Sequence, residues 1–111
     1  MKNLLQETLD ILKENGKTED DVLWVGDDFI DDDYHVITCK TTWDNFKQIA
    51  DFEYDNDYGS NHISLGLIVV GIDFWLERHE EEGNEWWEFK EIPKEPEISK
   101  TFQRDTIYSR Y

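Results

Sequence analysis

The chain has 111 residues and a formal net charge of −16 at pH 7, from 27 Asp and Glu against 11 Lys and Arg. Low hydrophobicity with high net charge is typical of disordered chains, but five Trp, five Tyr and six Phe are typical of a folded domain. The negative charge disfavours direct binding of nucleic acid, no apolar run approaches the ~20 residues of a membrane span, and the single Cys39 excludes an internal disulfide, so we expect a cytoplasmic protein.

The N-terminal part of the chain predicts two helical segments. Apolar residues at spacings of three and four predict an amphipathic helix over residues 2–15, which Asn15 and Gly16 end through a left-handed glycine cap. Thr18 precedes three acidic residues. This pattern predicts a single helical turn, because carboxylates stabilise the first turn of a helix.

Two strands and a second helix are predicted next. The composition of residues 22–30 and of residues 34–39 predicts two strands. The three aspartates between them, residues 31–33, are therefore expected to form a turn. Thr41, with an acid three residues later, resembles a capping box and predicts a helix that ends near Tyr54.

The C-terminal half predicts an antiparallel meander. Residues 55–64 are rich in Asn, Asp, Gly and Ser and predict a loop. Three strands follow, over residues 67–70, 74–79 and 85–92. Pro93 ends the sheet, because proline cannot donate to a ladder of hydrogen bonds.

The last two strands form a hairpin whose register follows if residues 80–83 are a four-residue loop. The predicted cross-strand pairs are Leu76 with Trp87, Phe74 with Phe89, Glu77 with Trp86 and Trp75 with Glu88. One face of the hairpin is then wholly apolar and belongs to the core. The other face carries two Trp among carboxylates.

Together these elements predict one α+β domain over residues 1–97, with two α-helices packed on a small antiparallel sheet of about four to five strands. Residues 98–111 are predicted to be a C-terminal tail that docks as an extended segment or stays loose. The tail differs from the domain in charge, since three cations stand against the single Asp105.

No spacing of residues predicts a catalytic or metal site. The loop around Gly59 fails as a calcium loop because Tyr54 and Tyr58 fall on ligand positions. The three His are scattered without a zinc motif, and Cys39 is expected to be a small buried hydrophobe rather than a nucleophile. We therefore expect no enzyme and no cofactor, although the aspartates of residues 27–33 leave a small carboxylate-metal hydrolase as a third hypothesis.

Acidic residues gather in groups along the chain, and clustered acid can imitate a nucleic acid. Spread evenly, the charge would amount to one per ~400 Å² of surface, whereas duplex DNA carries one per ~110 Å². The candidate acidic residues for binding a cationic partner are Asp27, Asp28, Asp31, Asp32, Asp33, Asp55, Asp57, Glu80, Glu81 and Glu82.

Trp75 and Trp86 are the candidate aromatic anchors. Both are expected on the hairpin face opposite the core, where either another element of the chain or a partner covers them. An aromatic anchor inside an acidic rim is typical of a surface that binds a protein rich in Arg and Lys.

Three parts of the chain resemble a family of small acidic proteins encoded by phages and prophages. They are residues 21–26 (DVLWVG), residues 42–47 (TWDNFK) with residues 54–59 (YDNDYG), and the Trp-rich hairpin of residues 75–79 and 85–90. The resemblance implies a phage or prophage origin and a site of action in the host cytoplasm. Small acidic phage proteins include anti-CRISPR inhibitors of Cas nucleases, to which this chain is similar in size and charge.

The leading hypothesis is a non-enzymatic inhibitor, an acidic DNA mimic that binds a basic nucleic-acid-handling protein such as Cas9 and blocks its binding of DNA. The alternative is a phage or prophage accessory protein whose acidity serves solubility and whose hairpin binds an unrelated partner or a second copy. Only the first hypothesis predicts competition with DNA that weakens as salt rises.

Overall fold

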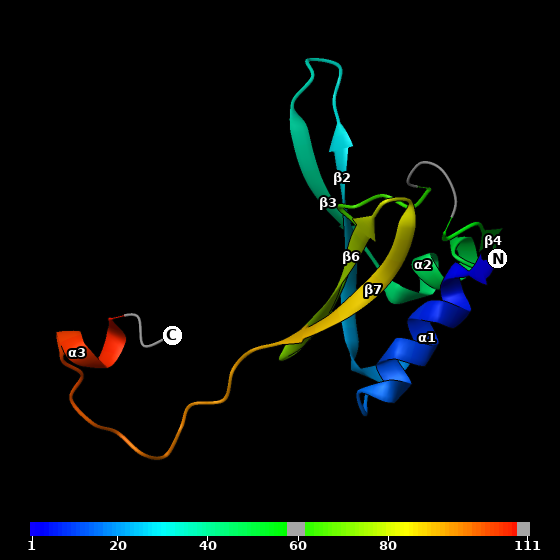
Figure 1. The fold of residues 1–111 in the computed structure, drawn as a ribbon. Helices are drawn as coiled ribbons and strands as arrows, with labels where there is room; N and C mark the ends of the chain where they lie inside the picture. The colour runs from blue at the N-terminus through cyan, green and yellow to red at the C-terminus, as the bar shows by residue number, and fades with distance from the viewer. Residues whose placement is uncertain (58–61, 109–111) are drawn as a thin grey trace.

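The computed structural model describes residues 1–57 and 62–108, and it confirms the predicted α+β fold (Figure 1). Helices α1 and α2 pack on one face of a five-stranded antiparallel sheet of order β3-β2-β5-β6-β7. The strands of this sheet are β2 (Val22–Ile30), β3 (Val36–Thr41), β5 (Ile68–Gly71), β6 (Phe74–Glu81) and β7 (Asn84–Glu91). A separate two-stranded sheet pairs β1 (Lys2–Asn3) with β4 (Glu53–Tyr54).

Helix α1 (Leu4–Glu14) begins two residues later than predicted, because β1 precedes it. The side chain of Asn3 caps the helix by accepting the backbone N–H of Gln6 at 2.9 Å. The residues that α1 buries, spaced four apart, are Leu4, Thr8 and Leu12. They lie on one face of the helix and pack toward the sheet.

Helix α2 (Trp43–Ile49) is shorter than the sequence predicted. It begins after Thr42 rather than Thr41, and the Thr42 hydroxyl accepts the backbone N–H of Asn45 at 3.1 Å. The predicted end near Tyr54 is wrong, because Tyr54 belongs to β4 and pairs with β1. Long-range strand pairing therefore overrides the helical pattern at this point.

The hairpin formed by β2 and β3 extends beyond the rest of the sheet. It follows the 3-10 helix η1 (Glu19–Asp21), which confirms the predicted single helical turn. Strand β5 pairs with β2 only as far as Gly26, whereas β3 pairs with β2 up to Ile30. Residues 27–39, here called the hairpin arm, therefore form a two-stranded ribbon that projects from the body, as Figure 1 shows.

The register of the β6–β7 hairpin differs from the prediction by two residues. Leu76 lies opposite Phe89 rather than Trp87, because residues 82 and 83 form a two-residue turn in place of a four-residue loop. Glu82 and Gly83 both have positive φ, 51° and 89°, as such a turn requires. Since strand side chains alternate with a period of two, the shift leaves every side chain on its predicted face.

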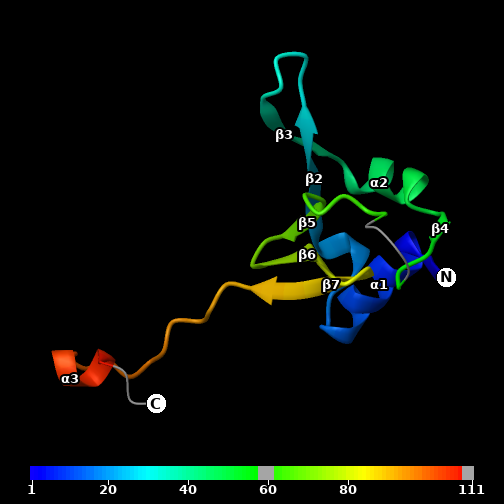
Figure 2. The same ribbon diagram turned by 45° about the horizontal axis from the view of Figure 1, so that its top comes forward.

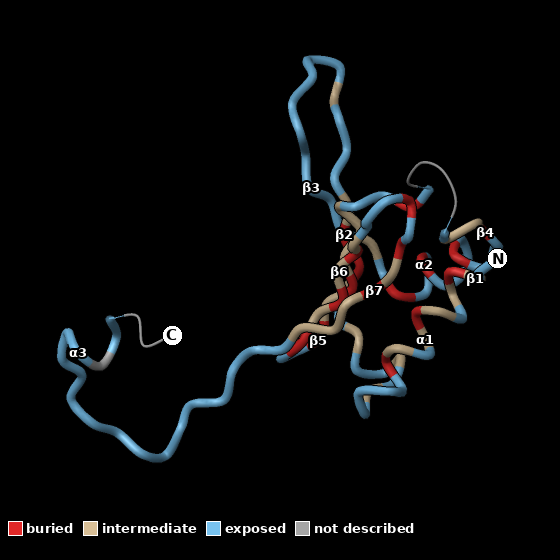
Figure 3. The backbone as a smooth tube through the Cα atoms, in the orientation of Figure 1, coloured by how far each residue is buried: buried red, intermediate tan, exposed pale blue. Residues whose placement is uncertain are grey.

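The core lies where α1 and α2 meet the sheet, as the buried segments in Figure 3 show. Its residues are Leu4, Leu12, Val25, Trp43, Phe46, Ala50, Tyr54, Ile63, Val69, Phe74, Leu76 and Trp87. The hairpin arm and the C-terminal segment are exposed in the same view. Among the described residues, no helix has the length and apolar character needed to cross a membrane.

The C-terminal segment leaves the end of β7 and runs away from the sheet (Figure 2). It ends in the short helix α3 (Arg104–Ile107), which the sequence did not predict. Its residues are exposed from Ile92 to Asp105, so most of the segment lies outside the core.

Candidate partner-binding surface

The side chain and backbone of Asp31 make the hydrogen bonds that stabilise the turn at the tip of the hairpin arm. Asp31 Oδ1 accepts the backbone N–H groups of Asp33 at 2.9 Å and of His35 at 2.8 Å, and the Asp31 N–H donates to the His35 carbonyl at 3.0 Å. Tyr34 takes the left-handed conformation, with φ of 63°. These bonds fix the predicted turn and leave Asp32 and Asp33 exposed at its apex.

Asp27 and Asp28 lie on opposite faces of the arm because strand side chains alternate. Asp28 accepts the hydroxyl of its cross-strand partner Thr38 at 2.8 Å, on the face away from the helices. Asp27 accepts the Ser64 hydroxyl at 2.7 Å, on the face toward α2. The sequence treated the two aspartates as one group. Their strand faces differ, but both carboxylates lie close to Gly66 in the loop before β5.

The arm also exposes large apolar side chains on both faces. Phe29 is paired with Ile37 and Ile30 with Val36, and their exposed fractions are 56%, 43%, 71% and 68%. A two-stranded ribbon of this kind is marginally stable in water alone. The acidic arm therefore offers apolar contact area as well as charge, which charge counting alone did not predict.

A second acidic group forms around the β6–β7 turn. Asp57 makes an isolated β-bridge with Asn84, and the backbone N–H of Glu85 donates to the carbonyl of Asn56 at 2.7 Å. These bonds bring the segment before residue 58 against the turn. The members of this turn group are Asp55, Asp57, Glu80, Glu81 and Glu82, all exposed except the half-buried Asp55.

The hairpin arm and the turn group lie at the same end of the sheet. Gly26 pairs with Ile68 and Ile68 pairs with Glu77, so these residues form one row across three strands. The arm continues beyond this row in β2, and the β6–β7 turn lies beyond it in β6. All the predicted acidic candidates are thus gathered at one end of the sheet, here called the acidic end, although in two groups (Figure 1).

Trp75 and Trp86 alternate along β6 and β7 with the buried Phe74, Leu76 and Trp87. They therefore lie on the outer face of the sheet, opposite the core that α1 and α2 cover, and both are half-buried. Trp24, which the sequence did not single out, joins them, because Val70 pairs with Trp24 on one side and with Trp75 on the other. The alternation of β2 predicts its face once the register is known.

Trp75 and Trp86 each donate a hydrogen bond to a glutamate two residues along the same strand. Trp75 Nε1 donates to Glu77 Oε1 at 2.8 Å, and Trp86 Nε1 donates to Glu88 Oε2 at 3.0 Å. The Trp75 hydrogen bond, followed by that of His79, lowers the pKa of Glu77. The Trp86 hydrogen bond lowers the pKa of Glu88 in the same way.

His79 links the two glutamates across the strands. Its Nε2 lies 2.8 Å from Glu77 Oε2 and its Nδ1 lies 3.4 Å from Glu88 Oε2. The imidazole stacks on Trp86 with 6.3 Å between ring centroids. The outer face is therefore an ordered layer of indoles and carboxylates rather than a loose apolar patch.

The sequence predicted that the core face of the same hairpin is wholly apolar. This prediction is wrong, because two charged side chains are buried there. Arg78 and Glu85 lie there with 1% of each side chain exposed, and their Nη2 and Oε1 atoms are 3.7 Å apart. Arg78 also donates to Glu7 at 3.3 Å and to the Tyr54 hydroxyl at 2.8 Å. Burial, and then the hydrogen bond to Glu7, raise the pKa of Tyr54.

Glu85 anchors the loop that precedes β5. Its two carboxylate oxygens accept the backbone N–H groups of His62 at 2.7 Å and of Ile63 at 2.9 Å. The alternation of β6 could have predicted this network. Arg78 is an even number of residues from the core residues Phe74 and Leu76, so its side chain lies on the same face of the strand.

Within the described part of the chain, three side chains that could together hold a metal ion are found at the arm tip. Asp31, Asp33 and His35 each offer one ligand atom within 4.8 Å of the others. The hydrogen bonds of Asp31 to the turn account for this proximity. Cys39 is exposed, so the expectation that it is buried is wrong. The part of the tested calcium loop that includes Tyr58 and Gly59 lies outside the described residues.

Comparison of the chain with protein-family models, with curated proteins and with solved structures found no match. A function for this chain must therefore be argued from its own surfaces. Two of them stand out, the acidic end with its projecting arm and the outer face with its three tryptophans.

Proposed function

We propose that this chain is a non-enzymatic inhibitor of phage type that binds a basic nucleic-acid-handling protein and competes with DNA for its channel. The observation that carries the proposal is the projecting hairpin arm. Its five aspartates span about 15 Å of ribbon at ~3.3 Å per strand residue, or roughly one charge for every 3 Å. A single nucleic-acid strand carries a similar charge, one per ~3.4 Å.

The surroundings of the arm add contact area to this charge. Ile30 and Val36 share the outer face of the arm with Asp28, and the same face of the sheet continues to Trp24 and Trp75. Carboxylates beside apolar and aromatic side chains suit a channel lined by Arg and Lys, because cations pair with the carboxylates and stack on the indoles. The turn group, at the β6–β7 turn, extends the acidic surface across the same end of the sheet.

A Cas nuclease such as Cas9 is the specific partner that we propose, because its guide–target duplex lies in a positively charged channel and arginines read the adjacent motif. The proposal of a phage or prophage origin favours the same partner. Any basic DNA-binding enzyme with an open channel would meet the same chemical requirement.

The test is affinity capture from cells that carry CRISPR and restriction systems, followed by a DNA-binding assay on the captured protein. The test variant is Asp28→Asn/Asp32→Asn/Asp33→Asn. The matched control is Glu14→Gln/Glu53→Gln/Glu95→Gln, which removes the same three charges at exposed positions away from the arm. We expect the arm variant to weaken inhibition about 10- to 100-fold and the control less than about threefold.

Two outcomes would contradict the proposal. If both triple variants weaken inhibition equally, net charge and not the arm is responsible. If the captured partner binds without competing with DNA, and without weakening as salt rises, the alternative of an accessory protein-binding module is favoured. The apolar side chains of the arm are the observation that supports this second function.

A further inference from the structure

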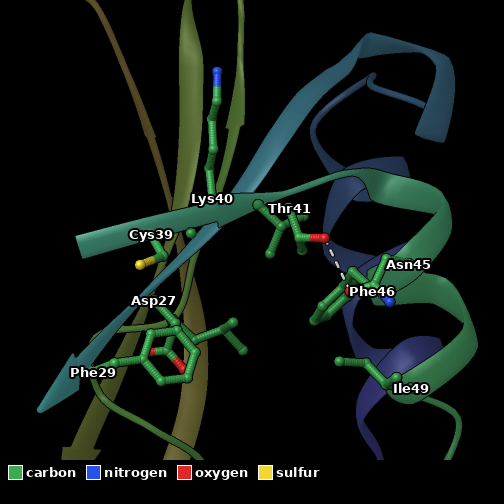
Figure 4. A pocket seen from close by; sticks show the side chains of 11 residues that line it. Asp27, Phe29, Cys39, Lys40, Thr41, Asn45, Phe46 and Ile49 are labelled. Atoms are coloured by element: carbon green, nitrogen blue, oxygen red, sulfur yellow. Dashed lines mark hydrogen bonds between the residues drawn. The ribbon is translucent and has the colours of Figure 1, made fainter. Parts of the chain in front are cut away.

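An apolar groove lies on the face of the hairpin arm that is turned toward α2 (Figure 4). Its volume is about 310 Å³. Phe29 forms one wall with 56% of its surface exposed, and Ile49 forms the other with 63% exposed. Since a cavity of about 150 Å³ holds a benzene ring, the groove has room for an aromatic and an aliphatic side chain.

Charge and backbone at the groove favour an extended, cationic occupant. Asp27 and Lys40 both line the groove, and Asp31 to Asp33 continue from Asp27 toward the tip, so the acids along the groove and its rim outnumber the one cation. Strand β3 is the edge strand of the sheet, so one side of its backbone is available to pair with another segment.

One segment of this chain has the matching composition. The C-terminal segment exposes Ile98, Phe102 and Tyr108 by 88%, 64% and 73%. Lys100 and Arg104 flank Phe102 two residues away on each side, with Lys100 and Phe102 in the extended part of the segment and Arg104 at the first position of α3. Between residues 98 and 108 two cations, Lys100 and Arg104, stand against the single Asp105.

The register of the sheet separates this segment from the groove of its own chain. Glu91 pairs with Phe74 at the end of the sheet opposite the acidic end, and the segment leaves from there. Helix α1 packs against β7, so a segment turning back toward the groove would have to pass the helical layer. A second copy can receive the segment without this obstacle.

We propose that the groove binds residues 98–108 of a second copy, with Phe102 in the cavity and its flanking cations beside Asp27 and the acidic rim. This contact uses the face of the arm toward α2. The inhibitor surface described above adds the opposite face, and both contacts use Asp27 and the aspartates of the arm tip. Phe102→Ser leaves every aspartate in place, so it tests the second-copy contact without altering the inhibitor surface.

The mass of the full-length protein in solution tests the proposal. Light scattering and sedimentation over 10–200 µM at 0.15 M salt should give a mass of two or more chains in reversible equilibrium. Phe102→Ser and Phe29→Ser should each weaken association at least tenfold, whereas Ile72→Ser, a control 80% exposed at the β5–β6 turn, should not. Phe102 lies outside the core, so its variant remains informative if Phe29→Ser fails to fold.

Cross-linking identifies the groove directly, because Cys39 lines it and is the only cysteine. Oxidation of the Thr101→Cys variant, which keeps Phe102, should join position 101 to Cys39, and mixing isotopically light and heavy protein should give mixed links. A monomer at all concentrations without this link would overturn the proposal. A monomer with the link formed inside one chain would also overturn it, because the segment would then occupy its own groove.

Discussion

At the scale of single residues, Arg78 supplies the positive charge that pairs with the carboxylates of the buried polar network. Its guanidinium lies 5.6 Å from the ring centre of Tyr54 and 4.9 Å from that of Trp87, and it neutralises the carboxylates of Glu7 and Glu85. Two buried carboxylates without a cation would be strongly destabilising. The network joins α1, β4 and the loop before β5 to the hairpin, so its loss should affect the whole domain.

We predict that Arg78→Met lowers the free energy of unfolding by about 3–5 kcal/mol, because it leaves two buried carboxylates uncompensated. Urea unfolding followed by tryptophan fluorescence measures the change. The control is Lys90→Met on the outer face of the same hairpin, where the half-buried ion pair with Glu88 is worth about 1 kcal/mol or less. Equal losses for the two variants would contradict the role of Arg78.

The outer tryptophans should respond to acid. The pKa values of Glu77 and Glu88 are lowered from the ordinary 4.5, so both carboxylates stay ionised in the folded protein below that pH. Their contribution to stability is therefore fully present above pH 4.5 and is lost as the pH falls below it. The Nε1–H resonances of Trp75 and Trp86 should shift as Glu77 and Glu88 take up protons in that acidic range.

The matched reference in the same spectrum is Trp87, whose Nε1 donates to the Thr8 hydroxyl at 2.9 Å and has no carboxylate partner of its own. Its resonance should stay in place until the domain unfolds. In the His79→Gln variant, which removes the imidazole that contacts both glutamates, a midpoint above pH 4.5 for Trp75 or Trp86 would show that the hydrogen bonds to Glu77 and Glu88 do not lower these pKa values.

At the scale of elements, the β6–β7 turn shows what sequence patterns determine. The alternation of residues 74–79 and 85–92 predicts both strands and the face of every side chain. The pairing register depends on the turn, and Glu82 is not a typical residue for its left-handed position. The sequence therefore favoured a longer loop. The predicted face of each side chain is still right, because the register differs by two residues and strand side chains alternate with a period of two.

The turn gives a prediction of opposite sign at two neighbouring positions. Glu82→Asn should stabilise the domain by about 0.5–1 kcal/mol, since Asn tolerates positive φ better than Glu. Gly83→Ala should destabilise it by about 1–2 kcal/mol, because a Cβ is strained at a φ of 89°. Thermal unfolding measures both changes. Stabilisation by Gly83→Ala would contradict the two-residue turn.

The candidate site was predictable where local patterns determine it and unpredictable where long-range pairing does. The turn of the arm and the outer position of Trp75 and Trp86 follow from residue type and alternation. The contacts of Asp27 with Ser64 and of Asp28 with Thr38, and the approach of Asp57 to the β6–β7 turn, depend on which strands pair and on where each pairing stops. No local pattern records these pairings.

At the scale of the whole molecule, charge is distributed unevenly. The acidic candidates lie at one end of the sheet, while Lys100 and Arg104 belong to the segment that leaves from the other end. Gathering like charges at one end costs stability through repulsion, and a folded protein tolerates this cost where a partner or solvent ions offset it. Both proposed interactions place cations at the acidic end.

Salt should therefore stabilise the domain. At 0.02 M salt the aspartates at the arm tip repel one another over a longer range than at 0.5 M, since the Debye length is about 10 Å at 0.1 M and shortens with concentration. We expect the melting temperature to rise with sodium chloride.

Asp32→Asn/Asp33→Asn should raise the melting temperature at low salt, and the difference from the unsubstituted protein should shrink at high salt. Lys40→Gln, which removes a cation from β3, should act in the opposite direction with the same salt dependence. A melting temperature that falls with salt, or a Lys40→Gln variant that stabilises, would show that repulsion within the acidic end is not a significant cost to this fold.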